Sequence, residues 1–403
     1  MPIATSTFAD HLLVRNKNWG RLFTARLISL VGDRFHFLAL TAFAYSLHHS
    51  ALDVGTMLFC RAAPALVLGP FAGVLGDRMN RKTLMMVSDF TRMALVILIP
   101  VTSARWTLYC LVFLINAVGT LFAPAAQGLL PQIVAEEDLK NANSLYSLAS
   151  WSASIVGPLL GGLVVGSLGY KWAFGFDALS FGVSGLLISL MEVDRIYRKR
   201  ITGFLEDLTH GIRNLTRCPG YRLVVESGVV FMLGGGFINT LLYVYATRSL
   251  GASPQQYGFM NTSIAIGAVA GTLFSTRLKK AEGQDLKRLI LVGFGLTSVG
   301  ITLVGLSSSY FVILALLGAV GFGNSLYNIF SVTLVQLEVA QDSLSRAMAF
   351  STTLMTSMNL VVTAAGGALG DLVDTGSIIA VAGGICLLYA VMTAVFRLRL
   401  LRN

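Results

Sequence analysis

Apolar stretches of about 20 residues or more, separated by short polar or Gly- and Pro-containing segments, follow one another along most of the chain. A helix of that length spans the hydrocarbon core of a bilayer. The first stretch follows a polar N-terminus and is too long for the core of a signal peptide, so we expect it to be retained. The pattern predicts twelve transmembrane helices, over residues 22–47, 54–75, 83–103, 106–127, 143–167, 171–191, 221–247, 255–276, 287–306, 310–335, 345–370 and 376–397.

The composition supports a membrane protein. Hydrophobic residues make up 55% of the 403 residues and charged residues 12%, whereas soluble proteins carry roughly 25% charged residues. With 41 Gly and only 9 Pro, the chain is unlike disordered or collagen-like sequences and suits transmembrane helices. We therefore predict an all-α membrane protein that has the lipid bilayer as its surroundings.

The distribution of Lys and Arg predicts the orientation. If the N-terminus is inside, inner segments hold 23 of the 30 Lys and Arg residues, and the outer loops hold only Arg105, Lys171 and Arg248. Positive charge marks cytoplasmic loops. We expect an inner or plasma membrane location with both termini in the cytoplasm. The same distribution accounts for the net charge of +10 without nucleic acid as a partner.

The longest inner loop divides the chain into two related halves. Residues 192–220 show apolar positions at helical spacing, which predicts an amphipathic helix on the membrane surface between bundles at 1–191 and 221–403. Residues at the inner end of the second helix of each half correspond at an offset of 198 positions, as transporter repeats do. The first-half members are Gly69, Gly73, Leu75, Asp77, Arg81 and Lys82, and their counterparts are Gly267, Gly271, Leu273, Ser275, Lys279 and Lys280.

Motifs for enzyme chemistry are absent from the sequence. There is no HExxH, GxSxG or GxxxxGK[ST] pattern, and the four cysteines show no CxxC spacing. We therefore expect no enzyme activity, no cofactor and no direct use of ATP.

A charged motif lies between the second and third predicted helices. It contains Gly73, Asp77, Arg78 and Arg81, and an Asp followed by basic residues can form charge pairs that open and close, or cap a neighbouring helix. The motif resembles the Gly-x-x-x-Asp-Arg-x-x-Arg signature loop of the major facilitator superfamily. The resemblance implies twelve helices in two pseudo-symmetric six-helix bundles, a monomer, and a conformational latch formed by these four residues.

A second motif, in the fifth predicted helix, contains Gly157, Pro158, Gly161 and Gly162. Its small residues permit close helix packing. It resembles the Gly-Pro-x-x-Gly-Gly antiporter motif of exporters in the superfamily, which implies a sliding surface and favours efflux. Fragments elsewhere resemble the exporter branch that includes macrolide-efflux and enterobactin-exporter proteins: Arg26-x-x-Ser29-x-x-Gly32-Asp33, Asp89-x-x-Arg92, Phe176-Asp177-Ala-Leu-Ser180 and Gln336.

Ionisable residues inside the predicted helices are candidates for coupling or substrate contact, because each costs about 2.5–3.5 kcal/mol at the centre of a membrane helix. Helical spacing places Arg26, Asp33 and His36 on one stripe of the first helix, which we expect to face the central cavity. Asp33 is the main candidate, paired with Arg34 or Arg61, and a permanent structural ion pair is the alternative. We expect Asp89 and Arg92 to pair with each other.

Metal transport is a weaker alternative. Asp33 and His36 have a spacing that suits two metal ligands, and the run around them resembles the first helix of ferroportin. No other His lies in a predicted helix.

The second half contributes polar side chains instead of charges. Gly234–Gly236 interrupt the seventh predicted helix ahead of Asn239 and Tyr243, and Asn324, Tyr327 and Asn328 follow a Gly-rich run in the tenth. Such side chains suit either an amphipathic substrate or hydrogen bonds between helices. We predict a secondary transporter that exports a hydrophobic or amphipathic small molecule, drug-like or siderophore-like, with protons as the coupling ion. A metal or lipid transporter is the alternative.

Overall fold

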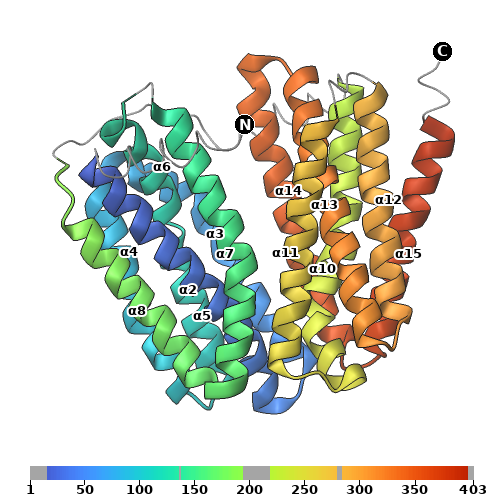
Figure 1. Ribbon diagram of the computed structural model, residues 1–403, viewed down its shortest axis with the longest axis horizontal. Helices are drawn as coiled ribbons and strands as arrows, with labels where there is room; N and C mark the ends of the chain where they lie inside the picture. The colour runs from blue at the N-terminus through green and yellow to red at the C-terminus, as the bar shows by residue number, and fades with distance from the viewer. Residues whose placement is uncertain (1–15, 136–137, 194–217, 279–283, 398–403) are drawn as a thin grey trace. The chain divides into compact units, whose positions relative to one another are not determined.

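The computed structural model describes residues 16–135, 138–193, 218–278 and 284–397. They are almost entirely helical, as Figure 1 shows. The helices are α2 (Lys17–His48), α3 (Ala51–Arg78), α4 (Arg81–Leu98), α5 (Arg105–Gly119), α6 (Phe122–Ile133), α7 (Leu139–Leu168), α8 (Tyr170–Ser189), α10 (Pro219–Leu250), α11 (Pro254–Arg277), α12 (Gln284–Leu306), α13 (Tyr310–Glu338), α14 (Gln341–Leu369) and α15 (Thr375–Met392). A short 3-10 turn follows α4 and a π turn follows α15.

The all-helical membrane fold predicted from hydropathy is confirmed. Within the described ranges, eleven helical stretches are long and apolar enough to cross a membrane, and α7 adds a shorter apolar run, Ser152–Leu168. The fourth predicted span consists of two helices, α5 and α6, which meet at Thr120 and Leu121. Hydropathy does not detect this break because both sides are equally apolar.

Contacts divide the chain into two compact units. The first unit comprises Met1–Leu47 and Cys60–Ile201, and the second comprises His48–Phe59 and Thr202–Asn403. The second unit thus includes the first residues of α3, which the boundary predicted at 191 assigns to the first bundle. The amphipathic helix predicted over 192–220 falls almost wholly on 194–217, outside the described residues.

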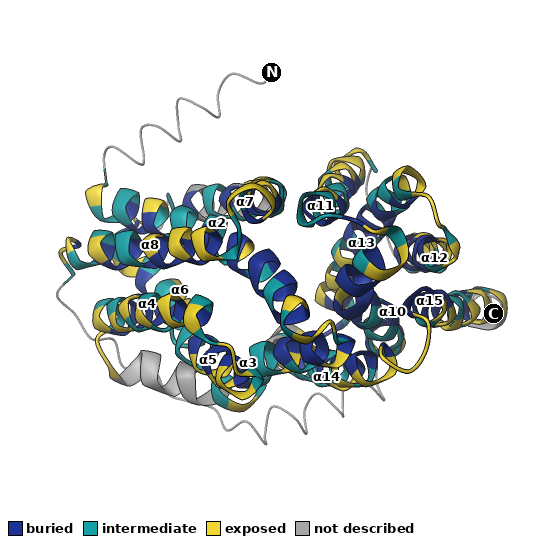
Figure 2. Cartoon of the chain, turned by 90° about the horizontal axis from the view of Figure 1, so that it is seen from below, coloured by how far each residue is buried: buried dark blue, intermediate teal, exposed yellow. Residues whose placement is uncertain are grey.

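Each unit has its own apolar core. In the first unit, α4 packs against α5, α6 and α8, and Trp19, Met85 and Phe122 are buried in its core. In the second unit, α13 packs between α11 and α12, and Tyr221, Phe294 and Tyr327 belong to the core. Buried residues line the facing sides of the helices within each unit, as Figure 2 shows. Many outward side chains are large and apolar, such as Trp106 and Phe311, as a lipid environment requires.

Glycines let α11 and α13 approach each other at backbone distance. A Cβ added at Gly267 would lie 1.9 Å from the carbonyl oxygen of Gly318, and one added at Gly321 would lie 1.9 Å from that of Ile264. Small residues at such crossings allow the backbones to make van der Waals contact. In contrast to the sequence prediction, Gly234 and Gly236 do not interrupt α10, which is continuous. They pack against Cys386 and Val362 instead.

Candidate functional site

A cluster of charged side chains lies in the first unit, where α2, α4 and α8 meet, and all of its members except Asp33 are buried. Arg92 on α4 pairs with Asp89 one turn earlier, and its other terminal nitrogen lies 3.9 Å from the carboxylate of Asp33 on α2. Ser184 on α8 donates a 2.6 Å hydrogen bond to Asp89. The Arg92 guanidinium also lies 4.1 Å from the ring centre of Phe181, which helps to stabilise a cation away from water.

The expected Asp89–Arg92 pair is therefore present, but Arg92 also faces a third residue, Asp33. Among the described residues, Arg92 is the ion-pair partner of Asp33, whereas Arg34 or Arg61 was predicted. Arg61 instead lies over the ring of Phe37, at 4.6 Å. The periodicity of α2 predicts which of its own residues share a face. It does not reveal that Arg92, on the neighbouring helix α4, lies at the depth of Asp33.

His36 and Asp177 form a second buried pair beside the first. His36 Nδ1 lies 2.8 Å from Asp177 Oδ2, and the side chains are 8% and 0% exposed. The His36 ring also packs edge-on against Phe174. His36 therefore points into the first unit, which corrects the expectation that it faces a central cavity with Asp33.

Gly32 explains how Asp177 comes so close to α2. A Cβ at this position would lie 2.1 Å from Ser180 Oγ and 2.8 Å from Asp177 Oδ1. The absence of a side chain is therefore what admits the Asp177-Ala-Leu-Ser180 segment of α8. The sequence contains both fragments, but only the packing joins them.

The charges in this cluster are unequal. Three carboxylates, Asp33, Asp89 and Asp177, share one arginine and one histidine. Buried charges need partners, so protonation of His36 or of a carboxylate brings the cluster closer to neutrality. Asp33, whose side chain is 39% exposed, is the member of the cluster that is most accessible from its surroundings.

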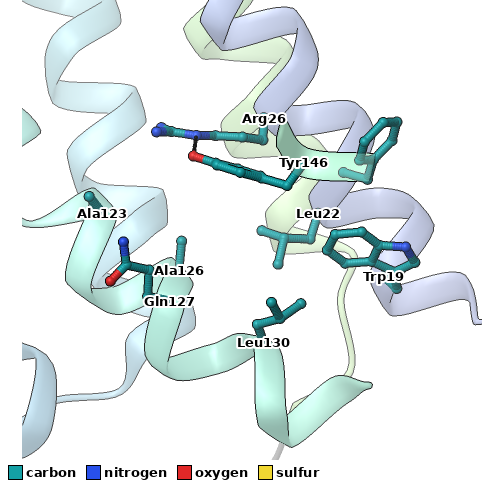
Figure 3. A pocket seen from close by; sticks show the side chains of 9 residues that line it. Trp19, Leu22, Arg26, Ala123, Ala126, Gln127, Leu130 and Tyr146 are labelled. Carbon is teal, nitrogen blue, oxygen red and sulfur yellow. Dashed lines mark hydrogen bonds between the residues drawn. The ribbon is translucent and has the colours of Figure 1, made fainter. Parts of the chain in front are cut away.

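Arg26, one of the predicted site residues, lies apart from this cluster, at a cavity of about 220 Å³. Its Nε donates a 2.7 Å hydrogen bond to the hydroxyl of Tyr146 on α7, and its guanidinium lies 5.0 Å from the ring centre of Phe122. Figure 3 shows the Arg26 guanidinium and the Gln127 amide toward one side of the cavity and Trp19 and Leu22 toward the other. The lining residues are Trp19, Leu22, Phe23, Arg26, Ala123, Ala126, Gln127, Leu130 and Tyr146.

The glycines of the predicted sliding motif pack against α2. A Cβ at Gly157 would lie 2.3 Å from Cβ of Arg34, and one at Gly161 would lie 3.2 Å from Cα of Phe35. Pro158 and Gly162 lie in the same continuous helix, α7. Arg34 therefore contacts α7 through its aliphatic stem.

The predicted latch is described only in part. Gly73, Asp77 and Arg78 lie within the last turns of α3, but their side chains are outside the described part. Arg81 begins α4, and its guanidinium donates to the carbonyl oxygen of Gly128 on α6.

The five polar candidates of the second half fall into two groups. Tyr327 and Tyr243 are core residues: Tyr327 Oη lies 3.1 Å from Ser227 Oγ and its ring stacks on Phe231, while Tyr243 packs edge-on against Tyr257. The remaining three stay partly or fully accessible, with Asn328 donating to the side chain of Asn324; they are Asn239, Asn324 and Asn328. The two tyrosines thus make contacts between helices.

Sequence reasoning missed a cluster around Asp371, just after α14. Its carboxylate accepts hydrogen bonds from Ser50 Oγ at 2.5 Å and from the N–H groups of Ala51 and Leu52 at 2.9 and 3.1 Å, so it caps α3. Arg248 Nη2 lies 2.6 Å away and also reaches the carbonyl oxygen of His49. Partial burial raises the pKa of Asp371, but these bonds outweigh it and lower the pKa to about 2. All of these residues belong to the second unit.

Asp33 and His36, the candidate metal ligands, do not face each other in the structure. His36 faces Asp177 instead of Asp33, and the described part of the chain contains no group of three His, Cys, Asp or Glu side chains that could hold a metal ion.

Comparison with known proteins identifies the family. The sequence pattern of the transmembrane secretion effectors matches residues 5–403. The chain is 28% identical to the MFS-type transporter YfiS of Bacillus subtilis over 399 residues, covering 95% of this chain and 94% of that protein. It is 24% identical to the enterobactin exporter EntS of Escherichia coli over 372 residues, covering 89% and 85%.

Solved structures show the same fold. The peptide transporter PepTSo of the POT family matches with a TM-score of 0.76 at 12% identity, over 95% of this chain and 98% of that one. A bacterial homologue of the iron transporter ferroportin matches with a TM-score of 0.72 at 15% identity, over 93% and 97%. The predicted major facilitator fold is confirmed. The chain belongs to the transmembrane secretion effector family of major facilitator transporters.

Proposed function

We propose that this transporter exports a hydrophobic or amphipathic small molecule, drug-like or siderophore-like, in exchange for protons. The direction is supported by the similarity to the enterobactin exporter. The observation that carries proton coupling is the buried cluster in the first unit, in which three carboxylates share one arginine and one histidine.

In this mechanism a proton binds at the accessible Asp33 and weakens its attraction to Arg92, which then pairs more fully with Asp89. His36, about one helical turn from Asp33 on α2, and Asp177 on α8 form a second proton-binding pair. Because each step changes a charge in a low-dielectric interior, it changes the relative free energies of the transporter's conformations.

The charge distribution supports a proposal for the location and orientation. We propose that the protein lies in the cell membrane as a monomer, as the family resemblance implies. Both termini lie in the cytoplasm in this proposal, because Lys and Arg are concentrated in one set of loops.

The test uses proteoliposomes with a pH gradient and an internal pH indicator. A macrolide, a cationic dye, a siderophore and Fe²⁺ are added in turn, and proton movement is measured for the wild type, Asp33→Asn and Asp177→Asn. Asp53→Asn is the matched control, because Asp53 is also a buried carboxylate 2.8 Å from a histidine, His48, but lies outside the cluster.

We expect an organic compound to release protons through the wild type and Asp53→Asn, but not through the two cluster variants. Downhill movement of the compound should persist in those variants, which shows that they are folded. Proton movement in neither the wild type nor the control, or a response to Fe²⁺ alone, would contradict the proposal. Full coupling in Asp177→Asn would make the His36–Asp177 pair structural.

A further inference from the structure

The cavity beside Arg26 has the features of a binding site for an organic anion. Arg26 lies inside a membrane helix, where an uncompensated cation is costly. Arg92, Arg222, Arg248 and Arg288 each face a carboxylate. Among the described residues, Arg26 faces none: its contacts are the Tyr146 hydroxyl and the rings of Phe122 and Tyr146.

The contacts of Arg26 hold the side chain in place but use only part of its hydrogen-bonding capacity. The hydrogen bond to Tyr146 occupies Nε, and the aromatic rings lie against the guanidinium. A guanidinium carries five N–H donors in a planar fork that matches a carboxylate. The terminal donors of Arg26 therefore remain suited to an anion, and the side chain is already held in place to receive one.

The cavity walls determine what kind of anion fits. Trp19, Leu22 and Leu130 supply an apolar surface, and Ala123 and Ala126 are small enough to leave space on α6. In Figure 3 the Arg26 guanidinium and the Gln127 amide lie on the side away from Trp19 and Leu22. A ligand with an acidic group at one end and an apolar body at the other satisfies both sides.

The size of the cavity limits how much of the ligand it holds. Its volume of about 220 Å³ is below the roughly 300–1,000 Å³ of sites for drug-sized ligands. It has room for an aromatic ring system and its acidic group, but not for a complete large molecule.

We propose that this cavity binds the acidic, aromatic end of an amphipathic organic anion, which is the substrate class of the transporter. Arg26 pairs with the acidic group, Gln127 donates a hydrogen bond to it, and the side of Trp19 and Leu22 holds the apolar body. The biological meaning of the site rests on the proposed export function, but the site itself is tested by binding without transport.

Trp19 provides a built-in reporter, because it lines the cavity. With Phe in place of the chain's other tryptophans, Trp106, Trp151 and Trp172, energy transfer from Trp19 to a dansyl group reports occupancy. The probes are dansylglycine, an anion, and dansylglycinamide, its neutral counterpart of nearly equal size. The protein is held in nanodiscs of phosphatidylcholine.

We expect dansylglycine to bind about 10- to 100-fold more tightly than the amide, the usual contribution of a charge-assisted hydrogen bond. Arg26→Gln should remove this preference and leave binding of the amide unchanged, and Arg26→Lys should retain part of it. Arg21→Gln is the matched control: it removes the same charge from the same helix, but Arg21 contacts the carbonyl oxygen of Leu190 and does not line the cavity.

Three results would overturn the proposal. The first is equal binding of the acid and the amide, and the second is an equal effect of Arg21→Gln and Arg26→Gln. The third is loss of dansylglycine binding when phosphatidylglycerol is added, which would assign the site to a lipid headgroup. These results are separate from a failure of proton coupling. A transporter that moves no protons but still selects the acid over the amide would contradict the proposed coupling alone.

Discussion

Replacement of Asp371 by Ala should release the first turn of α3. The carboxylate accepts bonds from Ser50 Oγ, from the N–H groups of Ala51 and Leu52 and from Arg248. Ala at this position leaves the two backbone donors without their acceptor. Arg248 keeps its bonds to the carbonyl oxygens of Gly370 and His49, so the effect should centre on α3.

The magnitude follows from the bonds and the exposure. Loss of a helix-capping side chain costs about 1 kcal/mol, and a hydrogen bond to a charged group contributes about 1.5–3 kcal/mol. The Asp371 side chain is 30% exposed, so solvent screening reduces the total to about 1–2 kcal/mol. Local opening of the first turn should therefore become about 5- to 30-fold more frequent.

Hydrogen–deuterium exchange of the peptide that contains Ala51–Asp53 measures this opening directly. Asp374→Ala is the matched control, because Asp374 lies nearby but caps α15 through a 2.8 Å bond from the N–H of Ser377. We expect faster exchange at the start of α3 in the first variant and at the start of α15 in the second. Exchange of Ala51–Asp53 that is unchanged in Asp371→Ala, or equally faster in both variants, would refute the reasoning.

The pH dependence has a definite sign. The pKa of Asp371 lies below its ordinary value, at about 2, so its contribution is complete above about pH 4 and is lost as the pH falls through about 2. Between pH 5 and 8, protection of the first turn of α3 should stay constant after correction for intrinsic exchange rates. A decrease within that range would show that another group holds the turn.

Two further predictions concern packing in the second unit. Gly267→Ala places a Cβ 1.9 Å from the Gly318 carbonyl oxygen and should destabilise the protein by about 1–3 kcal/mol. Gly295→Ala is the control: its Cβ would have no neighbour within 4 Å beyond its own stretch of helix, so this change should be neutral or slightly stabilising. Thermal unfolding of the purified variants compares the two, and equal midpoints would contradict close α11–α13 packing. Tyr327→Phe removes the hydroxyl near Ser227 and should lower the free energy of unfolding by about 0.5–1.5 kcal/mol, with the KM for transport unchanged. A higher substrate KM in a transport assay would instead indicate that Tyr327 contacts the substrate.

The sequence was sufficient to predict the helices because the hydropathy of each span depends only on residues that are adjacent in the chain. A stretch of apolar residues predicts a span wherever it occurs, and charged loops add the orientation. The break between α5 and α6 escaped prediction because Thr120 and Leu121 are as compatible with a helix as their neighbours.

The sequence pattern of a single helix could not predict which side chains pair between different helices. Periodicity placed Asp33 and His36 on the same stripe of α2, yet the structure gives them different partners, Arg92 and Asp177. Asp177 lies 141 positions from His36 along the chain, and nothing in either helix specifies their contact. Gly32 was the available signal, because a glycine beside a buried charge indicates close approach by another element.

The assignment of His48–Phe59 to the second unit means that the two halves of the coding sequence are not the two halves of the folded protein. A gene split in the central segment would yield a C-terminal fragment without the piece of α3 that Asp371 caps, and with the Gly367 surface, which contacts Gly55, left uncovered. Separately expressed halves should therefore fold well only when produced together, with the N-terminal fragment completing its partner.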